Sequence, residues 1–564
     1  MSYHTFLDPE LIIPISRLST EALKTGSWSR SRPVFEEKYS PCSAACPNAN
    51  NIASTMFKAS QGDYDGALAA FLEESPLPGV CGRVCDHVCQ SKCNRSDHDG
   101  SLQIRALERT VSDLGNASPS RLTDAGNNIP VAVIGSGPAG LAAAYHLARM
   151  GHPVKLIEAR DRLGGLLAWG IPGYRLPEEA LKRDLERILT LDIEAVTNQP
   201  MDRAGLAKLL GSHRAVLMAT GVWAPTAMGI PGEELEGIWP GLDFLLDGAM
   251  QTQVKGQRVV VIGGGNTAID AARVAARRGA AKVSILYRPD LEALPASDDE
   301  VKEAEEEGIQ RTAAQPVGFA GDNGRVSAVR CKEPVLVAGC SMSEGAGEFL
   351  CDLVITAIGQ SLGTSSLYSE LDLDRGRIAA DRQGRTTRKG LYVAGDAGQL
   401  RATVVDAMAS GKQAALAIHC DLSGRTDLIA AASAGSGTFS ISELFRSGPK
   451  RVPGVTAEVN RYSFLTATTT PPQSAPSLDV GMRVSGFREV VGGLGAQEAA
   501  AEAGRCFYCG SCIGCDLCAT FCPEVSMGQT NGKTAYECDP DHCKGCGACA
   551  AVCVRGVLTM GDEQ

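Results

Sequence analysis

Thiols are concentrated at regular spacing in the C-terminal part of the sequence. Cys512, Cys515 and Cys518 form a C-x-x-C-x-x-C run, and a second run of the same spacing begins at Cys543. Each run is followed by one more cysteine, the first of them directly before a proline. Clustered thiols of this kind, in a chain without a secretion signal, indicate metal binding rather than disulfides. Two runs of three cysteines, each followed by a fourth, favour iron–sulfur clusters over zinc, because four-cysteine zinc sites usually pair two C-x-x-C elements.

The order of the two runs predicts which thiols share a cluster. In the bacterial ferredoxin pattern the fourth cysteine of each run ligates the other cluster, so we expect two [4Fe–4S] clusters here. The expected ligand sets are Cys512, Cys515, Cys518 and Cys553 for one cluster, and Cys543, Cys546, Cys549 and Cys522 for the other. A turn at QTNGKT should join the two halves. The surplus tail cysteines, expected to be packing or spare thiols, are Cys506, Cys509 and Cys538.

A glycine-rich loop far upstream, GSGPAG, lies between a short apolar run and an Ala-rich helical pattern. Gly135 allows a tight turn after the strand, Gly137 lets backbone N–H groups approach a pyrophosphate, and Gly140 lets the helix pack on the strand. The positive end of the helix dipole then faces the phosphates. Glu158 ends the next strand, where its carboxylate can accept hydrogen bonds from ribose hydroxyls. This combination predicts a dinucleotide site.

Later residues indicate that the first dinucleotide is FAD. The strand LYVAGDA ends at Gly395 and Asp396, which places a carboxylate near a ribityl chain in flavoproteins with two dinucleotide domains. A helix beginning near Val404 can direct its N-terminus at the flavin. Gly221 ends an ATG segment that is usual in such flavoproteins where the chain returns from the inserted domain. The other candidate FAD-binding residues are Pro138, Ala139, Arg162 and Gly165.

A second loop, GGGNTA, repeats the design about 128 residues further on, with Gly263 and Gly265 followed by Ala268. The position that matches Glu158 is a tyrosine, and Arg288 follows it. An acidic residue there would favour NAD, whereas an arginine suits the 2′-phosphate of NADP. We therefore favour NADP(H); if Arg288 only caps a strand or pairs with Asp290, NADH stays open. The remaining candidate residues of this loop are Asn266 and Thr267.

Together these cofactors suggest a converter of electron pairs into single electrons. Nicotinamide delivers hydride, flavin can release electrons singly, and iron–sulfur clusters carry one electron each. The cofactors carry such chemistry, so no catalytic side chain is assigned, and the eight histidines form no recognisable catalytic group.

Short apolar strands alternate with Ala-rich helices around these motifs. This alternation is typical of parallel βαβ units, which would position the motifs. The fold class is therefore multidomain: a helical iron–sulfur domain, two Rossmann-like α/β domains and a ferredoxin-like α+β domain. The expected boundaries are 1–127 for the helical domain, 128–245 with 362–425 for FAD, 246–361 for NAD(P), 426–500 for a linker or surface-wrapping segment, and 501–564 for the ferredoxin domain.

Composition excludes some functions. A net charge of −11 argues against nucleic-acid binding, and 44% hydrophobic with 21% charged residues is ordinary for a globular chain. No apolar run reaches the length of a membrane helix, and the first residues lack the pattern of a signal peptide. We therefore expect a cytoplasmic protein.

Six more cysteines lie near the front, at positions 42, 46, 81, 85, 89 and 93. The combination of CGRVC, GSGPAG, RLGGLLAWGIPGYRLP, GGGNTAID, YRPD and AGDA resembles the small subunit of NADPH-dependent glutamate synthase over residues of about 40–420. It is also similar to the N-terminal half of dihydropyrimidine dehydrogenase and to the large subunit of ferredoxin:NADP transhydrogenase. The tail resembles a two-cluster ferredoxin, as in related flavoproteins that serve sulfite-reductase-type and 2-oxoacid-type enzymes.

The resemblance implies a front [4Fe–4S] cluster held by Cys46, Cys85, Cys89 and Glu108; the alternative for Glu108 is an ordinary exposed helix residue. A second front cluster in the family uses a C-x-x-C pair that falls on Val34 and Glu37 here. That cluster would lack two ligands, and its remaining partners would be Cys42 and Cys93. We therefore expect one front cluster.

The expected function is an FAD-dependent NAD(P)H:acceptor oxidoreductase that exchanges electrons with a protein partner, a ferredoxin or an iron–sulfur reductase. The alternative is a free-standing or bifurcating ferredoxin:NAD(P)+ oxidoreductase. A thiol–disulfide reductase would need a C-x-x-C facing the flavin, and residues 130–420 contain none. A zinc scaffold with vestigial nucleotide domains would leave the glycine loops unexplained. A homodimer and a hetero-oligomer both stay open.

Overall fold

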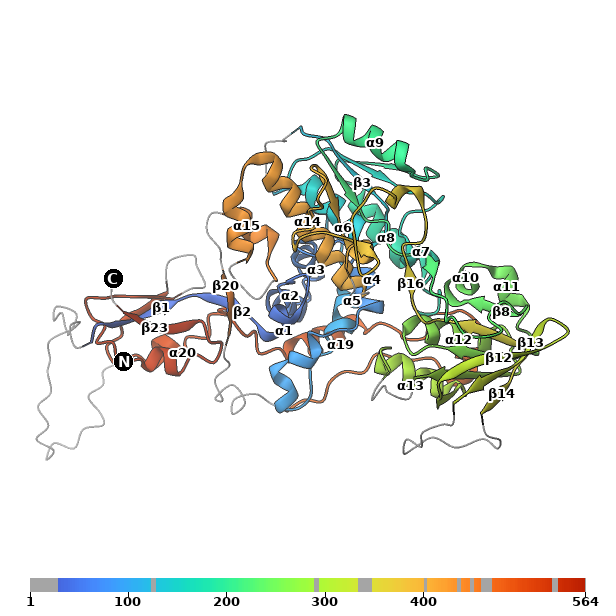
Figure 1. The fold of residues 1–564 in the computed structure, drawn as a ribbon. Helices are drawn as coiled ribbons and strands as arrows, with labels where there is room; N and C mark the ends of the chain where they lie inside the picture. The colour runs from blue at the N-terminus through green and yellow to red at the C-terminus, as the bar shows by residue number, and fades with distance from the viewer. Residues whose placement is uncertain are drawn as a thin grey trace, which may run out of the picture.

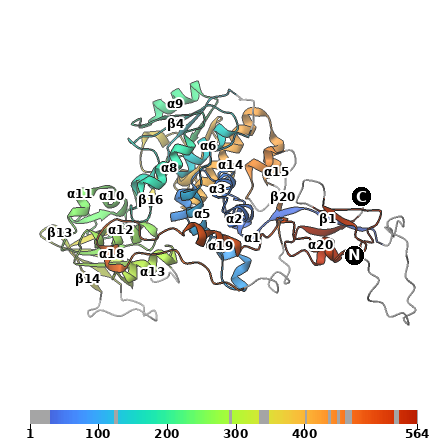
Figure 2. The same cartoon turned by 180° about the vertical axis from the view of Figure 1, so that it is seen from behind.

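The computed structural model describes residues 29–562 except 123–127, 289–293, 333–346, 400–402, 434–437, 447–450, 458–468 and 530–535. Two α/β domains, a helical front domain and a small C-terminal domain make up the described chain, and the C-terminal domain projects at the end opposite the second α/β domain (Figure 1). The view from behind shows the same order, with the front helices between the C-terminal domain and the α/β domains (Figure 2).

The first α/β domain is built on a parallel five-stranded sheet of order β19-β6-β3-β4-β5. Alternate residues of its strands face opposite layers, so Val131 and Val133 pack under one set of helices while Ala132 and Ile134 pack under another. The strands are β3 (Val131–Ile134), β4 (Val154–Ile157), β5 (Ile193–Val196), β6 (Ala215–Met218) and β19 (Leu391–Val393). The helices are α6 (Pro138–Arg149), α7 (Leu166–Trp169), α8 (Glu178–Ile188), α9 (Arg203–Ser212) and α14 (Val404–Ser423).

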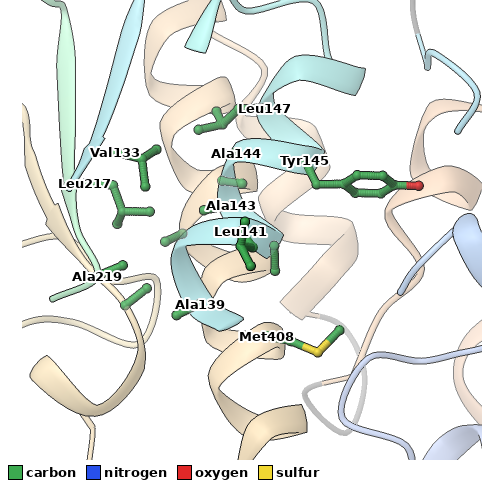
Figure 3. Close-up of a cluster of buried hydrophobic side chains, with 14 of the residues drawn as sticks. Val133, Ala139, Leu141, Ala143, Ala144, Tyr145, Leu147, Leu217, Ala219 and Met408 are labelled. Atoms are coloured by element: carbon green, nitrogen blue, oxygen red, sulfur yellow. The ribbon is translucent and has the colours of Figure 1, made fainter. Parts of the chain in front are cut away.

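Helices α6 and α14 pack closely because small residues line their contact. A Cβ on Gly411 of α14 would lie 2.0 Å from the Ala139 carbonyl oxygen. Figure 3 shows the resulting core, in which Val133 and Leu217 of the sheet, the alanines of α6 and Met408 of α14 lie together. Tyr145 points away from the sheet, and its hydroxyl donates to the Leu72 carbonyl of the front domain.

The second α/β domain repeats the design with a parallel sheet of order β11-β10-β9-β15-β8. Helix α12 covers one face, and a three-stranded antiparallel sheet covers the other. The strands of the parallel sheet are β8 (Ile238–Pro240), β9 (Arg258–Ile262), β10 (Lys282–Tyr287), β11 (Gln310–Ala313) and β15 (Leu353–Thr356). The covering elements are α10 (Gly241–Leu246), α11 (Gly248–Thr252), α12 (Asn266–Arg277), α13 (Asp298–Glu306), β12 (Pro316–Asp322), β13 (Arg325–Cys331) and β14 (Glu348–Leu350).

The front domain is a group of short helices packed on the first α/β domain. Lys412 of α14 is almost completely buried and pairs with Glu74, while its ammonium also donates to the Asn48 carbonyl at 2.8 Å. A buried pair that is hydrogen-bonded on both sides is costly to break, so it fixes the two domains against each other. The helices are α1 (Pro41–Ala45), α2 (Ile52–Ser60), α3 (Tyr64–Leu72), α4 (Pro78–Val84), η2 (Gln90–Lys92), η3 (Asn94–Asp97) and α5 (Ile104–Leu114).

Strands from the two ends of the described chain pair with each other. Strand β1 (Ser31–Phe35) pairs antiparallel with β23 (Leu558–Asp562), so Val34 lies in a strand beside the tail. Strand β2 (Glu37–Tyr39) pairs with β20 (Arg451–Thr456). The other tail elements are α20 (Leu517–Thr520), β21 (Met527–Gln529), β22 (Tyr536–Cys538) and α21 (Ala548–Ala551); most of the QTNGKT turn lies outside the described residues.

The segment expected to be a linker carries α15 (Thr426–Ser433), α16 (Ile441–Phe445), α18 (Val480–Val484) and the start of α19 (Ala496–Gly504). Part of it lies along the second α/β domain, where Arg483 pairs with Glu306 at 2.7 Å. Further on, α19 packs on the front domain, since the Glu502 carboxylate accepts from the Gln103 backbone N–H at 2.9 Å. None of the helices in the described residues combines the length and apolarity of a membrane span.

Candidate functional site

One cavity of about 490 Å³ lies where both glycine loops meet the front domain. Its wall includes the first loop, the ends of β4 and β19, and the N-terminus of α14. Asn266 and Thr267 of the second loop also line it, as do Val84 and Asp86 of the front domain. The predicted cofactor residues in this wall are Gly135, Gly137, Pro138, Ala139, Glu158, Gly165, Gly221, Asn266, Thr267, Gly395, Asp396 and Val404.

The first loop has three glycines for three separate reasons. Gly135 has φ +98°, and a Cβ on it would lie 2.3 Å from the Ala219 carbonyl oxygen. A Cβ on Gly140 would lie 1.9 Å from the Gly135 carbonyl oxygen, so this position keeps the helix against the turn. A Cβ on Gly137 would meet nothing within 4 Å, which leaves the space through which a pyrophosphate can approach the loop.

The two carboxylates of the cavity are held differently. Glu158 is buried, and its side chain accepts from the backbone N–H groups of Ser136 at 3.1 Å and Arg160 at 2.9 Å, which fixes its orientation toward the cavity. The Oδ1 atom of Asp396 is buried without a hydrogen-bond partner, and burial raises the pKa of Asp396 to about 6. A buried oxygen with no partner is costly, so a ligand hydroxyl that donates to it fits this position.

The second loop repeats the first two glycine positions of the first loop, carries Ala268 in place of Gly140, and has different residues at its rim. A Cβ on Gly263 would lie 2.3 Å from the Ala357 carbonyl oxygen, and a Cβ on Gly265 would meet nothing within 4 Å. Helix α12 begins there without a side-chain cap, so its first N–H groups are available to phosphate oxygens. Arg288 follows the end of β10 and is exposed; Asp290 lies outside the described residues.

Six of the predicted cofactor residues do not line the cavity: Gly140, Arg162, Gly263, Gly265, Ala268 and Arg288. Gly140, Gly263 and Ala268 shape the two loops from behind. Arg162 is instead held near the surface, where it pairs with Glu178 at 3.3 Å and stacks on Trp169. Sequence reasoning missed Ser136, whose hydroxyl accepts from the Gly164 N–H at 3.0 Å and joins the loop to the following segment.

The front thiols gather around a buried carboxyl group. Cys46 and Cys89 are buried, and Cys85 follows α4, which packs so tightly on α5 that a Cβ on Gly82 would lie 2.4 Å from the Arg109 backbone nitrogen. Burial raises the pKa of Cys46 to about 11, and the nearby Glu108 charge adds to the shift. Glu108 lies in α5, the helix that packs on α4, and is close enough to affect the Cys46 thiol of the predicted front set electrostatically.

Glu108 is 7% exposed, so the alternative of an ordinary exposed helix residue is wrong. Its Oε1 atom is buried without a hydrogen-bond partner, and burial raises the pKa of Glu108 to about 8. An oxygen left bare beside thiols fits a fourth ligand. The signal was present in the sequence, since Ile104, Leu107 and Val111 mark the apolar stripe of α5 and Glu108 lies in that stripe.

The tail contains two small cavities, of about 20 and about 10 Å³. Each is lined by four cysteines, and each set contains three from one run and one from the other. Cys515 and Cys546 are the exposed members, so each cavity reaches the surface at one thiol. The first cavity holds Cys512, Cys515, Cys518 and Cys553; the second holds Cys522, Cys543, Cys546 and Cys549.

A further cavity of about 20 Å³ lies between the front domain and the start of the tail. It is lined by Cys42 and Cys93, and by Cys506 and Cys509, which we expected to be packing or spare thiols. Burial raises the pKa of Cys42 to about 12, with the thiolate charges of Cys93 and Cys509 adding to the shift. The structure thus brings together two pairs of thiols that are more than 400 residues apart in sequence.

Two glycine loops around one cavity, with cysteine groups beside it, define a flavin-dependent NAD(P)H oxidoreductase with iron–sulfur clusters. A family model described as "Pyridine nucleotide-disulphide oxidoreductase" matches residues 129–411, and the chain belongs to this family. A second model, described as "Dihydroprymidine dehydrogenase domain II, 4Fe-4S cluster", matches residues 32–119. The predicted fold class and the cofactors FAD, NADP(H) and [4Fe–4S] clusters are therefore confirmed.

Curated relatives match much of the chain. The NADP(+)-dependent formate dehydrogenase subunit beta of Moorella thermoacetica is 33% identical over 521 residues, which cover 83% of this chain and 70% of that protein. The glutamate synthase [NADPH] small chain of Azospirillum brasilense is 33% identical over 67% of this chain and 85% of its own length. The NADPH-Fe(3+) oxidoreductase subunit beta of Geobacter sulfurreducens is 36% identical over 60% of this chain, but the match spans only 54% of that protein.

Proposed function

We propose that this chain oxidises NADPH as the electron-transfer subunit of a larger redox enzyme and passes single electrons to an iron–sulfur partner. The observation that carries this proposal is the wall of the large cavity, where Asn266 of the second loop, Gly137 of the first loop and Val84 of the front domain meet. Val84 directly precedes Cys85 of the front set. One space therefore adjoins a nicotinamide loop, a flavin loop and a cluster site.

The residues divide the work of binding and orientation. Gly135, Gly137 and the N-terminus of α6 would hold the FAD pyrophosphate, with Glu158 on a ribose and Asp396 on the ribityl chain. Gly263, Gly265 and the N-terminus of α12 would hold the pyrophosphate of NADPH, with the Arg288 guanidinium on its 2′-phosphate. When bound, these groups supply hydride transfer to flavin and one-electron carriage by iron.

Three cluster sites follow from the predicted ligand sets. The front site would use three thiolates with the Glu108 carboxylate, whose bare Oε1 atom favours a ligand role over a purely structural one. The tail sites would use the thiols that line the two tail cavities. The ligand sets are Cys46, Cys85, Cys89 and Glu108; Cys512, Cys515, Cys518 and Cys553; and Cys522, Cys543, Cys546 and Cys549.

The partner is best described by its chemistry, an enzyme subunit that exchanges single electrons through iron–sulfur clusters. Two of the relatives are named as beta subunits, which supports a hetero-oligomer. The relative that matches 83% of this chain is named a formate dehydrogenase subunit, so we place a formate-oxidising partner ahead of sulfite-reductase-type and 2-oxoacid-type enzymes. We place the partner's contact surface on the tail, because the thiols of Cys515 and Cys546 are exposed there and bring both predicted tail clusters near the surface.

The test is rapid anaerobic mixing of the full chain with NADPH, followed by flavin absorbance and by electron paramagnetic resonance of the reduced clusters. We expect the flavin to bleach first and the clusters to become reduced afterwards. In Cys85→Ser, flavin bleaching should persist while cluster reduction slows by at least about 10-fold, because the site next to the flavin is damaged. The matched control is Cys81→Ser, one helical turn away and outside the predicted set. Flavin bleaching with clusters that stay oxidised in the unmodified chain would contradict the proposal.

A second candidate is a free-standing or bifurcating ferredoxin:NAD(P)+ oxidoreductase, which the exposed tail thiols also suit. It predicts that reduced ferredoxin alone supports NADP+ reduction by the purified chain. The partner model instead predicts that steady turnover requires the second subunit.

A further inference from the structure

Four thiols from the two ends of the chain surround the cavity between the front domain and the tail. Cys42 lies in α1 and Cys93 follows η2, whereas Cys506 and Cys509 follow α19. Helix α19 holds its end of the site firmly, because Glu502 is fully buried and accepts from the Gln103 backbone, and Arg505 pairs with Asp99 at 3.0 Å.

The Cys506–Cys509 loop has the backbone conformation of the two ferredoxin loops. The third residue of the first C-x-x-C in each ferredoxin run has positive φ, +69° at Gly514 and +66° at Gly545, and Tyr508 at the same place in the Cys506–Cys509 loop has +50°. Such a φ is unfavourable for a tyrosine and is kept only where the surroundings require it. The Tyr508 N–H donates to the Cys506 sulfur at 3.3 Å, as the Gly545 N–H donates to the Cys543 sulfur at 3.4 Å. The loop is thus shaped as a ligand loop.

Polar groups of the front domain contact sulfur atoms from both ends of the chain. The Asn94 amide donates to the Cys509 sulfur at 3.4 Å, and the Ser40 hydroxyl lies 3.1 Å from the Cys42 sulfur. Hydrogen bonds to ligand sulfurs are typical of iron–sulfur sites and tune their potentials. The volume, about 20 Å³, equals that of the tail cavity around Cys512.

A single metal ion does not suit this arrangement. Within the residues that the structure describes, no group of three or more His, Cys, Asp or Glu side chains is arranged for one ion, and this includes the cysteine sets of the tail. Zinc would draw four sulfurs to about 2.3 Å from one centre. Four thiols around one small cavity instead match the four-cysteine sets of the two tail cavities.

We propose that Cys42, Cys93, Cys506 and Cys509 hold a fourth [4Fe–4S] cluster, which joins the front domain to the tail. The four thiols lose their protons on ligation, and the iron and sulfide come from the cell's cluster-assembly supply. The C-x-x-C pair that the family places before Cys42 is replaced here by Val34 and Glu37, and the tail supplies a pair of the same spacing in its place.

The position of this site suggests a relay, a role that rests on the function proposed above, whereas the cluster itself does not. On one side, Cys42 packs against the buried cluster that contains Cys46 and Cys89 of the front set, and its carbonyl accepts from the Cys46 backbone N–H at 3.1 Å. On the other side, Arg555 donates to the Phe507 carbonyl and also lines the cavity around Cys512. Electrons accepted from the front site would therefore pass singly through this cluster to the tail clusters.

The test compares iron and sulfide in the full chain, purified anaerobically, with those of two double variants. Four clusters predict about 16 iron atoms per chain, and three predict about 12. Cys506→Ser with Cys509→Ser, and Cys42→Ser with Cys93→Ser, should each lower the iron content by about 4. Both should keep FAD and its bleaching by NADPH, while reduction of the tail clusters slows by at least about 10-fold. The control is Cys331→Ser, a lone buried cysteine of the second α/β domain.

Three results would overturn the proposal: about 12 iron atoms in the unmodified chain, zinc at this site, or the same iron content in the double variants as in the control. The count in the unmodified chain decides the matter even where a variant fails to fold. Failure of the proposed function has a different signature, since NADPH would then reduce none of the clusters whatever their number.

Discussion

The two glycine loops share one backbone design and differ in their surroundings. Gly135 and Gly263 both turn the chain at positive φ against the carbonyl of a neighbouring strand end, and Gly137 and Gly265 both leave open space. The first loop, however, is pressed against α14 and is followed by the buried Glu158. In the second loop, residues 263–267 are all half-buried, whereas the first loop includes the buried Ser136 and Ala139; the rim residue of the second loop is the exposed Arg288.

This difference in burial matches the two proposed ligands, a flavin that stays bound and a nicotinamide dinucleotide that enters and leaves. A loop pressed against a second helix, with a buried carboxylate beside it, suits a ligand that is bound once and retained. A half-open loop with a charged rim suits a dinucleotide that exchanges at every turnover, and its rim can select between NADPH and NADH. Under the proposed function, the same local sequence pattern serves two purposes, and the surrounding layers decide which.

The sharpest test of the comparison exchanges the third position, where the first loop has Gly140 and the second has Ala268. Gly140→Ala should destabilise the first α/β domain by about 3 kcal/mol or more, because the new methyl group would collide with the Gly135 backbone. We expect loss of FAD and a lower unfolding temperature. The reciprocal Ala268→Gly should cost only about 1 kcal/mol, mainly through helix propensity. If the two substitutions had equal effects, the third position of the first loop would not be closed to a methyl group.

The second test places the same methyl group in the open position of each loop. Gly137→Ala and Gly265→Ala should fold normally, since the added Cβ meets nothing within 4 Å. Each methyl group would crowd a bound pyrophosphate, at a cost of about 1–3 kcal/mol, or about 10- to 100-fold in affinity. Gly137→Ala should lose FAD on dialysis, whereas Gly265→Ala should keep FAD and raise the KM for NADPH. If Gly265→Ala also released FAD, the division between the loops would be wrong.

Local patterns in the sequence predicted most of the nucleotide half. Strand, glycine turn and helix are adjacent in the chain, so GSGPAG and GGGNTA carry their own structural context, and the fold class followed from them. The crossed sets of the tail were equally local, and the cavities there group the cysteines as their spacing predicted. Spacing within a short segment is enough where the segment folds on itself.

The site between front and tail could not be found in this way, because its halves belong to segments far apart in the chain. Nothing near Cys42 indicates that α19 will deliver Cys509 beside it. One indirect signal was present: the front lacks a C-x-x-C pair at Val34 and Glu37, and the tail has a surplus pair of that spacing. Arg162 was placed at the flavin because its stretch resembles the family motif, but in this fold it pairs with Glu178 at the surface.

The third test concerns the rim of the second loop. Arg288→Ala should lower kcat/KM for NADPH by about 10- to 100-fold, because a charge-assisted contact to a 2′-phosphate contributes about 1.5–3 kcal/mol. The value for NADH should hardly change, since that cofactor has a hydroxyl in place of the phosphate. The matched control is Lys282→Ala at the opposite end of the same strand, where an exposed charge is removed far from the loop. A parallel loss with both cofactors would mean that Arg288 supports the strand end rather than the phosphate. The two loops would then differ only in exposure, and the choice of NADPH would have to lie elsewhere in the cavity wall.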